Sequence, residues 1–285
     1  MNKGQPVELL NTKYGWMFAP PGDQYVTGSL RNWGVYSETE TLILNRLCQN
    51  ATSVLNAGGN IGALILGVAN NNTSAQFHVF EPQPLLFKML KANIAINNLD
   101  EYIHVYQGIF SDNTDDVYIP MIKTDCEYNM GRFGKEDWEK PESLTYGIKT
   151  KSYEINRVLE FNQVDFIILD VEGMELDLLR KAEDYIKTYM PTMWIECDRE
   201  DNGKEMIQYI YDLGYSPYWM VNPLTPDGAR PDISPWPMQC SFNLLCVPEG
   251  ELFPLPNIPQ IKASPNDPIG NAPADKIIYH VKDKI

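Results

Sequence analysis

Three acidic residues of this chain, Glu81, Asp170 and Glu196, each close a short apolar run that is typical of a buried strand. In an open parallel sheet, ligands bind at the carboxyl ends of the strands, so we predict that the three carboxylates face one crevice. Glu172 follows two residues after Asp170 and adds a fourth acid there. Because no histidine is convincingly placed, we predict Asp170 or Glu172 as a general base, with Glu196 as its orienting partner or a substrate ligand.

A turn of small residues, 56–62, separates the first apolar strand from a helical segment. Glycines let a backbone approach a ligand closely, and the helix N-terminus presents unpaired N–H groups. Glu81 then ends the next strand, where a carboxylate can accept hydrogen bonds from ribose hydroxyls. The glycine spacing departs from G-x-G-x-x-G and favours S-adenosylmethionine over NAD, although a tight turn without a ligand is the plainer alternative. The predicted cofactor-binding residues of the turn are Asn56, Gly58, Gly59, Asn60 and Gly62.

The composition narrows the classes of function. The formal net charge is −15 and the isoelectric point is about 4.6, which disfavours nucleic acid and anionic membrane surfaces as partners. Five cysteines without a C-x-x-C pair support neither a zinc site nor a disulfide framework. The first residues lack the apolar stretch of a signal peptide, so we expect a cytoplasmic protein.

Strand-like and helix-like segments alternate along most of the chain, which predicts an α/β fold with a mainly parallel sheet and helices on both faces. A hairpin is expected from 16–19 and 24–27. The other expected strands are 52–56, 76–81, 103–107, 116–119, 147–151, 163–170, 192–196, 215–220 and 241–247. The expected helices are 38–49, 62–70, 84–97, 153–161, 175–188 and 204–213.

We predict three parts: an entry segment over 1–36, a main domain over 37–247 and a proline-rich arm over 248–285. The arm is expected to be extended or disordered, with a short strand near its end. An insert, 121–146, breaks the regular alternation, and we interpret it as an acceptor-binding lid or, alternatively, as a partner-binding loop. Its candidate contacts are Tyr128, Arg132, Phe133 and Trp138.

The sequence resembles the FkbM family of S-adenosylmethionine-dependent O-methyltransferases. The resemblance lies in VLNAGGNIG, VFEPQPLLFKMLKANIAIN, VDFIILDVEGMELDLLRKA and MWIECD, and also in the entry segment GVYSETE. It implies a class I methyltransferase (Rossmann-like) fold, doubly wound around a mainly parallel seven-stranded sheet. It also implies methyl transfer to a hydroxyl of a sugar, polyketide or similar small metabolite.

With this resemblance, Asn56, Gly58 and Asn60 are expected at the methionine and ribose end of the cofactor. Asp112 is expected near the adenine amino group, or else as a loop cap, with the backbone of Gly108 and Ile109 nearby. Further positions that the family implies for the cofactor are Pro82, Tyr36 and Glu40.

Two residues differ from the family pattern: Asn56 where the family usually has Asp, and Ile168 where it tends to have Lys. These two differences leave open the alternative that the protein is a non-catalytic binding or scaffold protein with the same fold. An NAD-dependent oxidoreductase is a less favoured alternative. We predict no metal because the sequence lacks a persuasive ligand cluster, and a divalent metal bridging Asp170 and Glu196 is the alternative. The expected partner is a hydroxylated small molecule, and homo-oligomer formation stays open.

Overall fold

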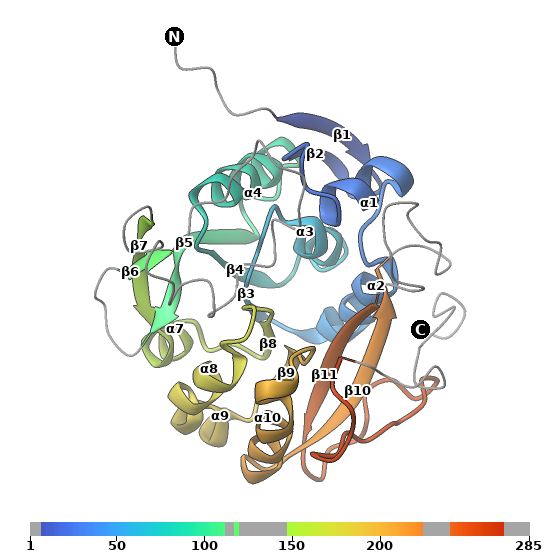
Figure 1. Cartoon of the computed structure of the whole chain (residues 1–285), viewed down its shortest axis with the longest axis vertical. Coiled ribbons are helices and arrows are strands. Elements are labelled where there is room, and N and C mark those ends of the chain that lie inside the picture. The colour runs from blue at the N-terminus through green and yellow to red at the C-terminus, as the bar shows by residue number, and fades with distance from the viewer. Residues whose placement is uncertain (1–6, 112–116, 120–146, 225–239, 271–285) are drawn as a thin grey trace.

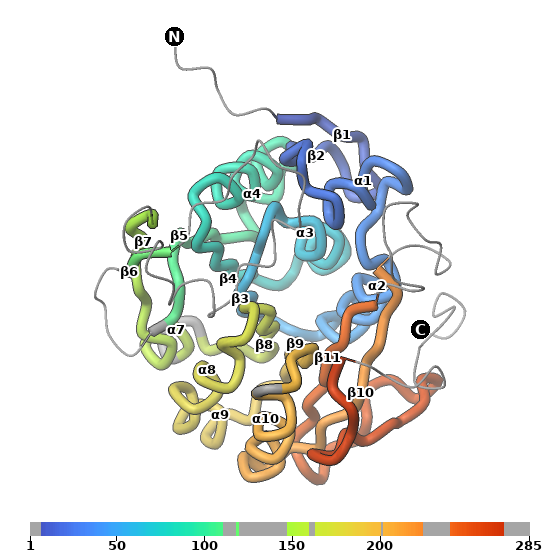
Figure 2. The backbone as a smooth tube through the Cα atoms, in the orientation of Figure 1, coloured from blue at the N-terminus to red at the C-terminus, as the bar shows by residue number. Residues whose placement is uncertain are grey.

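Apolar segments of the chain form one large sheet and a separate hairpin (Figure 1). The computed structural model describes residues 7–111, 117–119, 147–224 and 240–270, which are the coloured parts of the tube in Figure 2. The hairpin strands are β1 (Glu8–Thr12) and β2 (Gly15–Ala19). The sheet strands are β3 (Ser53–Ala57), β4 (Gln76–Glu81), β5 (Ile103–Ser111), β6 (Val117–Ile119), β7 (Ile148–Glu154), β8 (Phe166–Leu169), β9 (Thr192–Glu196), β10 (Tyr215–Pro223) and β11 (Cys240–Pro248).

The order of the large sheet is β10-β11-β9-β8-β3-β4-β5-β7-β6. Strands β9, β8, β3, β4, β5 and β7 pair in parallel, while β11, β10 and β6 are antiparallel to their neighbours. This confirms the class I methyltransferase arrangement. The described part of the sheet has nine strands instead of the expected seven, because β7 and β6 extend the edge beyond β5.

The register brings four strand ends to one edge of the sheet. Ala57 of β3 lies opposite both Phe80 of β4 and Leu169 of β8. Leu169 in turn lies opposite Ile195 of β9. Each of these residues immediately precedes, along the chain, the glycine turn or one of the three predicted acids, so the turn and the acids lie side by side.

Helices cover both faces of the sheet, as Figure 1 shows. They are α1 (Val26–Trp33), α2 (Glu38–Leu47), α3 (Ala63–Ala69), α4 (Pro84–Ile96), α7 (Ile155–Asn162), α8 (Glu175–Lys181), α9 (Glu183–Tyr189) and α10 (Glu200–Asp212), with a short 3₁₀ turn at Cys48–Asn50. One apolar core lies under α1 to α4 and the other under α7 to α10. The single helix expected over 175–188 is divided at Ala182 into α8 and α9.

The predicted hairpin over 16–19 and 24–27 is wrong. Its first strand, β2, exists, but it pairs in antiparallel fashion with the preceding strand β1, with Thr12 opposite Gly15 across a two-residue turn. The expected second strand is instead the start of helix α1. The Asp23 carboxylate accepts a hydrogen bond from the Thr27 N–H at 2.7 Å, which satisfies a donor that the first helical turn would leave unpaired.

In its described part, 249–270, the proline-rich segment after β11 packs against the sheet, as expected of an extended arm and not of a disordered tail. It lies along β10, where the Trp219 N–H donates to the Ile261 carbonyl at 2.8 Å and the Ala263 N–H to the Pro217 carbonyl at 2.9 Å. The Trp219 indole N–H donates to Asp267 at 2.7 Å. The short strand expected in the last residues, and the insert with its four candidate contacts, lie outside the described residues.

Two leucines of this arm provide a test of its packing. Leu255 is 3% exposed and belongs to the core under α1 to α4, whereas Leu252 is 92% exposed. We expect Leu255→Ala to lower the free energy of unfolding by about 3 kcal/mol, because it removes a buried side chain and leaves a cavity. Urea unfolding followed by circular dichroism measures this, and Leu252→Ala is the control, expected to stay within about 0.5 kcal/mol of wild type. Equal effects of the two substitutions would contradict the packed arm.

Among the residues described, no helix combines the length and the apolar composition required to span a membrane.

Candidate functional site

The glycine turn follows directly from the end of β3 and is hydrogen-bonded to the neighbouring strand β4. The N–H groups of Gly58 and Gly59 both donate to the Phe80 carbonyl, at 2.9 and 2.8 Å. Gly58 has a φ of +94°, and a Cβ atom there would lie 1.8 Å from the Asp170 carbonyl oxygen. Only glycine fits this position. Gly58 is therefore required because the turn passes very close to the backbone of Asp170, directly after β8.

The other two glycines of the turn are also surrounded by protein. A Cβ atom on Gly59 would lie 2.4 Å from Val79 Cγ1, and one on Gly62 would lie 2.6 Å from Leu66 Cδ1. Packing within the protein therefore also favours glycine at these positions, beside any approach of a ligand to the turn.

Glu81 is buried at the end of β4 and is held by the backbone. Its Oε2 accepts the Asn60 N–H and its Oε1 accepts the Gln83 N–H, each at 2.8 Å. Burial raises the pKa of Glu81 to about 7, and the two backbone hydrogen bonds oppose that rise. Each carboxylate oxygen can accept a second hydrogen bond. Both oxygens therefore keep acceptor capacity for a pair of hydroxyl groups.

The remaining predicted cofactor residues are placed as follows. Asn56 is buried in β3, with Val79 opposite on one side and Ile168 on the other. The Pro82 carbonyl accepts a hydrogen bond from the Thr150 hydroxyl at 3.4 Å. Ile109 is buried in β5. Asp112 lies outside the described residues.

Ile168, the position where the family tends to have lysine, is 1% exposed and packs in the core that contains Trp194. Side chains two residues apart in a strand point to the same face of the sheet. Ile168 and Trp194 therefore form an apolar layer directly below Asp170 and Glu196.

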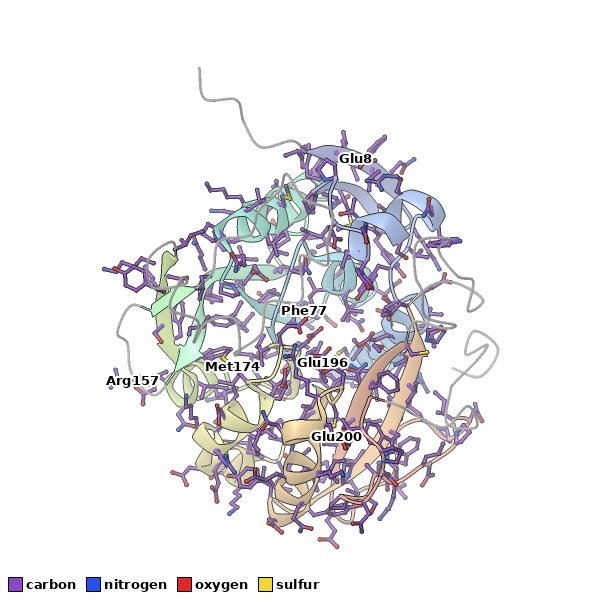
Figure 3. All side chains as sticks on the ribbon, in the orientation of Figure 1. Glu8, Phe77, Arg157, Met174, Glu196 and Glu200 are labelled. Carbon is purple, nitrogen blue, oxygen red and sulfur yellow. The ribbon has the colours of Figure 1, made fainter. Side chains whose placement is uncertain are left out.

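The structure brings the three predicted catalytic acids together. One side-chain oxygen from each of Asp170, Glu172 and Glu196 lies within 4.8 Å of the others, so the three oxygens can share a proton or approach one cation. Asp170 is exposed, while Glu172 and Glu196 are half-buried. Figure 3 labels Glu196 near the centre of the molecule, between the end of β8 and helix α2.

The carboxyl groups of Asp170 and Glu196 lie close together, and Glu196 Oε2 is buried without a hydrogen-bond partner among the described residues. Although one side of Asp170 is open to solvent, desolvation by the surrounding protein and the charges of Glu40 and Glu175 raise its pKa to about 7. Burial and the Asp170 charge raise the pKa of Glu196 well above the usual range of a carboxyl group. Like charges this close disfavour double ionisation, so the pair holds a proton to higher pH than a free carboxylate does.

Glu172 is in a different environment, because it forms an ion pair with Arg199. Burial and the Asp170 charge raise its pKa, and the Arg199 charge opposes that rise. The guanidinium crosses over Gly173, where a Cβ atom would lie 3.2 Å from Arg199 Cδ. The sequence analysis did not identify Arg199, which lies three residues after Glu196 at the start of α10.

Glu175 has the helix-terminal role expected for an acid near a helix N-terminus. Its carboxylate accepts the Val171 N–H at 2.9 Å and the Gly173 N–H at 3.1 and 3.2 Å. It thereby holds the loop of Asp170 and Glu172 in place at the start of α8.

Tyr36 and Glu40 lie near the acidic cluster, at the start of α2. Burial and the charges of Asp170, Glu40, Asp23 and Glu196 raise the pKa of Tyr36 well above its ordinary value, so its hydroxyl stays protonated. Glu40 accepts hydrogen bonds from Trp194, Ser37, Ser241 and Asn243. Trp194, Ser241 and Asn243 were not identified from the sequence. The only available signal was that Trp194 lies two residues before Glu196 and so shares its face of the sheet.

Several known proteins with similar sequences or structures are methyltransferases. The family model described as "Methyltransferase FkbM domain" matches residues 56–217. "Methyltransferase 1" of Beauveria bassiana (strain ARSEF 2860) is 22% identical over 199 residues, which are 63% of this chain and 77% of that protein.

Two solved structures are also similar. Methyltransferase FkbM from Methylobacillus flagellatus KT aligns with a TM-score of 0.44 and 15% identity over 68% of this chain, which spans only 43% of that longer protein. Precorrin-6y C5,15-methyltransferase from Geobacter metallireducens GS-15 aligns with a TM-score of 0.45 and 8% identity, over 75% of this chain and 88% of that one.

Proposed function

Because the chain belongs to the FkbM methyltransferase domain family, we propose that this methyltransferase moves a methyl group from S-adenosylmethionine to a hydroxyl of a small metabolite. The observation that carries the proposal is the arrangement of the strand ends. A buried carboxylate with spare acceptor capacity, Glu81, lies on one side of the glycine turn. The neighbouring carboxyl groups of Asp170 and Glu196 lie on the other side.

The residues of the turn fit a nucleoside cofactor. Both Glu81 oxygens can accept ribose hydroxyls while keeping their backbone hydrogen bonds. Asn60 has a φ of +48°, its N–H donates to Glu81 and its side-chain oxygen accepts the Ile61 N–H, so the loop is preformed. S-adenosylmethionine supplies an activated methyl group on a sulfonium, which leaves positioning and proton removal to the protein.

Asp170 is the general base of the proposed reaction. It is the exposed member of the acidic cluster, whereas Arg199 engages Glu172. In the reaction the methyl carbon leaves sulfur and bonds to the acceptor oxygen, and the hydroxyl proton moves to Asp170. Glu196, whose carboxyl group lies beside that of Asp170, orients the base. A base with a pKa of about 7 is well matched to proton transfer near neutral pH.

A neutral hydroxylated acceptor, such as a sugar or a polyketide-like compound, suits a crevice rimmed by carboxylates, because an anionic acceptor would be repelled. The exclusion of nucleic acid and membranes, homo-oligomer formation and a cytoplasmic location stay predictions from the sequence.

Isothermal titration calorimetry tests the cofactor directly. We expect S-adenosylmethionine and S-adenosylhomocysteine to bind with micromolar dissociation constants and NAD not to bind. Failure of both sulfur compounds to bind would overturn the proposed function and favour a non-catalytic binding protein, whereas binding of NAD alone would favour an oxidoreductase.

Glu81→Ala tests the ribose contact. We expect it to raise the dissociation constant of S-adenosylmethionine about 100-fold, because two hydrogen bonds to a charged group are lost. Glu101→Ala removes an exposed carboxylate just before β5 and should leave the affinity unchanged. An unchanged affinity in Glu81→Ala would show that Glu81 does not hold the cofactor.

A further inference from the structure

Glu40 is the third residue of α2. It is 6% exposed, and four hydrogen-bond donors surround its carboxylate. Its Oε1 accepts the Trp194 indole N–H at 2.9 Å and the Asn243 amide N–H at 3.2 Å. Its Oε2 accepts the hydroxyls of Ser37 at 2.7 Å and Ser241 at 3.1 Å. These contacts use the full acceptor capacity of a carboxylate.

The four donors come from three separate parts of the chain. Trp194 belongs to β9 and lies two residues before Glu196, while Ser241 and Asn243 belong to β11. Ser37 immediately precedes α2 and follows Tyr36. The Glu40 carboxylate therefore fastens the start of α2 to the strand ends that carry the acidic cluster.

We propose that Glu40 is a positioning residue for the catalytic carboxyl pair: its four hydrogen bonds hold the start of α2, next to Tyr36, against β9, which ends at Glu196. The inference rests on the proposed function and deepens it. It gives Glu40 a role through Asp170 and Glu196, since its own oxygens have no acceptor capacity left for a ligand.

The charged and titratable groups around Asp170 come from all the elements that surround it. They are Tyr36, Glu40, Glu172, Glu175, Glu196 and Asp198. After desolvation, the Glu40 charge is the largest cause that raises the pKa of Asp170. Arg199 is engaged with Glu172. Burial raises the pKa of Glu40 itself, and its four hydrogen bonds oppose that rise. Wherever Glu40 is ionised, removal of its charge should make Asp170 easier to ionise.

Glutamine can replace Glu40 with the hydrogen bonds kept. The two N–H donors meet one carboxylate oxygen, which the amide oxygen of glutamine can replace. The two donors at the other oxygen are hydroxyls, which can turn to accept from the glutamine NH₂ group. Glu40→Gln thus removes the charge and retains the geometry, whereas Glu40→Ala removes both.

The test measures the ionisation of Asp170 by ¹³C NMR of its side-chain carboxyl, assigned by its absence in Asp170→Asn. We expect the midpoint, near 7 in the wild type, to fall by about one pH unit in Glu40→Gln. The control is Glu38→Gln, which removes a carboxylate two residues away that pairs with Lys13, and it should leave the midpoint unchanged. In calorimetry, Glu40→Ala should raise the dissociation constant of S-adenosylmethionine at least about ten-fold, while Glu40→Gln should not.

An unchanged midpoint in Glu40→Gln, or an equal shift in Glu38→Gln, would overturn the inference. Equal cofactor affinity in Glu40→Ala and wild type would show that the hydrogen bonds of Glu40 do not position the site. Absence of cofactor binding by the wild type would instead reject the proposed function, while the NMR midpoints would still report whether Glu40 acts on Asp170.

Discussion

Replacing Asp170 by asparagine is expected to lower kcat by about 10²–10⁴-fold, the usual contribution of a positioned general base. Asparagine keeps the shape of the side chain but cannot take the proton from the acceptor hydroxyl. The loss should appear in kcat with little change in cofactor affinity, because Glu81 and the glycine turn stay intact. Formation of S-adenosylhomocysteine with an acceptor found by screening hydroxylated metabolites measures the rate.

Glu172→Gln is the matched control, since Glu172 belongs to the same cluster but is ion-paired with Arg199. We expect its effect on kcat to be clearly smaller than that of Asp170→Asn. The reverse order would assign the base to Glu172. Full turnover in both variants would remove the carboxylate-base mechanism altogether.

The pH dependence follows from the same residue. Asp170 must be ionised to act as a base, and its pKa is raised to about 7. The rate should therefore rise about ten-fold per pH unit below 7 and level off above it. Any residual rate of Asp170→Asn should lack this rise. A wild-type midpoint near pH 4 would show that the carboxyl pair does not hold its proton as the structure indicates.

Gly58→Ala is expected to destabilise the protein by at least about 4 kcal/mol, enough to prevent folding in many domains. The new methyl group would lie 1.8 Å from the Asp170 carbonyl oxygen, so either the turn or the loop after β8 must move. The positive φ of +94° adds strain for any residue with a Cβ atom. Soluble expression and urea unfolding measure the effect.

Gly250→Ala separates the two causes. Gly250 has a similar φ of +90°, but no atom lies within 4 Å of the added Cβ. It should cost only about 1–2 kcal/mol, the backbone part of the penalty. If the two glycine variants were equally stable, the contact between the turn and Asp170 would not exist in the folded protein.

Much of the fold followed from local patterns. Apolar runs of strand length, each followed by a helical period, determined the α/β class and the order of most elements. The acids at the ends of three such runs could be placed in one crevice because parallel strands bring their carboxyl ends to the same edge. One oxygen from each of Asp170, Glu172 and Glu196 lies within 4.8 Å of the others, while their catalytic roles stay predictions.

Local patterns failed where a turn signal or a proline-rich composition had two interpretations. Pro20 to Asp23 has the composition of a hairpin turn, but Asp23 caps a helix there. The arm after β11 cannot form regular strands, yet its apolar side chains pack and Asp267 binds the Trp219 indole. These outcomes depend on which parts of the folded protein each segment packs against, and a short stretch of sequence does not contain that information.

The sequence by itself determined the family, the sheet and the set of acids that could act. Only the tertiary structure decided how these acids differ: Glu172 is paired with Arg199, Asp170 lies beside Glu196, and Glu81 is fastened to the turn. It also joined Glu40 to Trp194 and Asn243, which lie 154 and 203 positions away in the chain. Strand periodicity and end positions are encoded by neighbouring residues, whereas hydrogen-bond partners and pKa shifts arise from atoms that only the folded chain brings within a few ångströms.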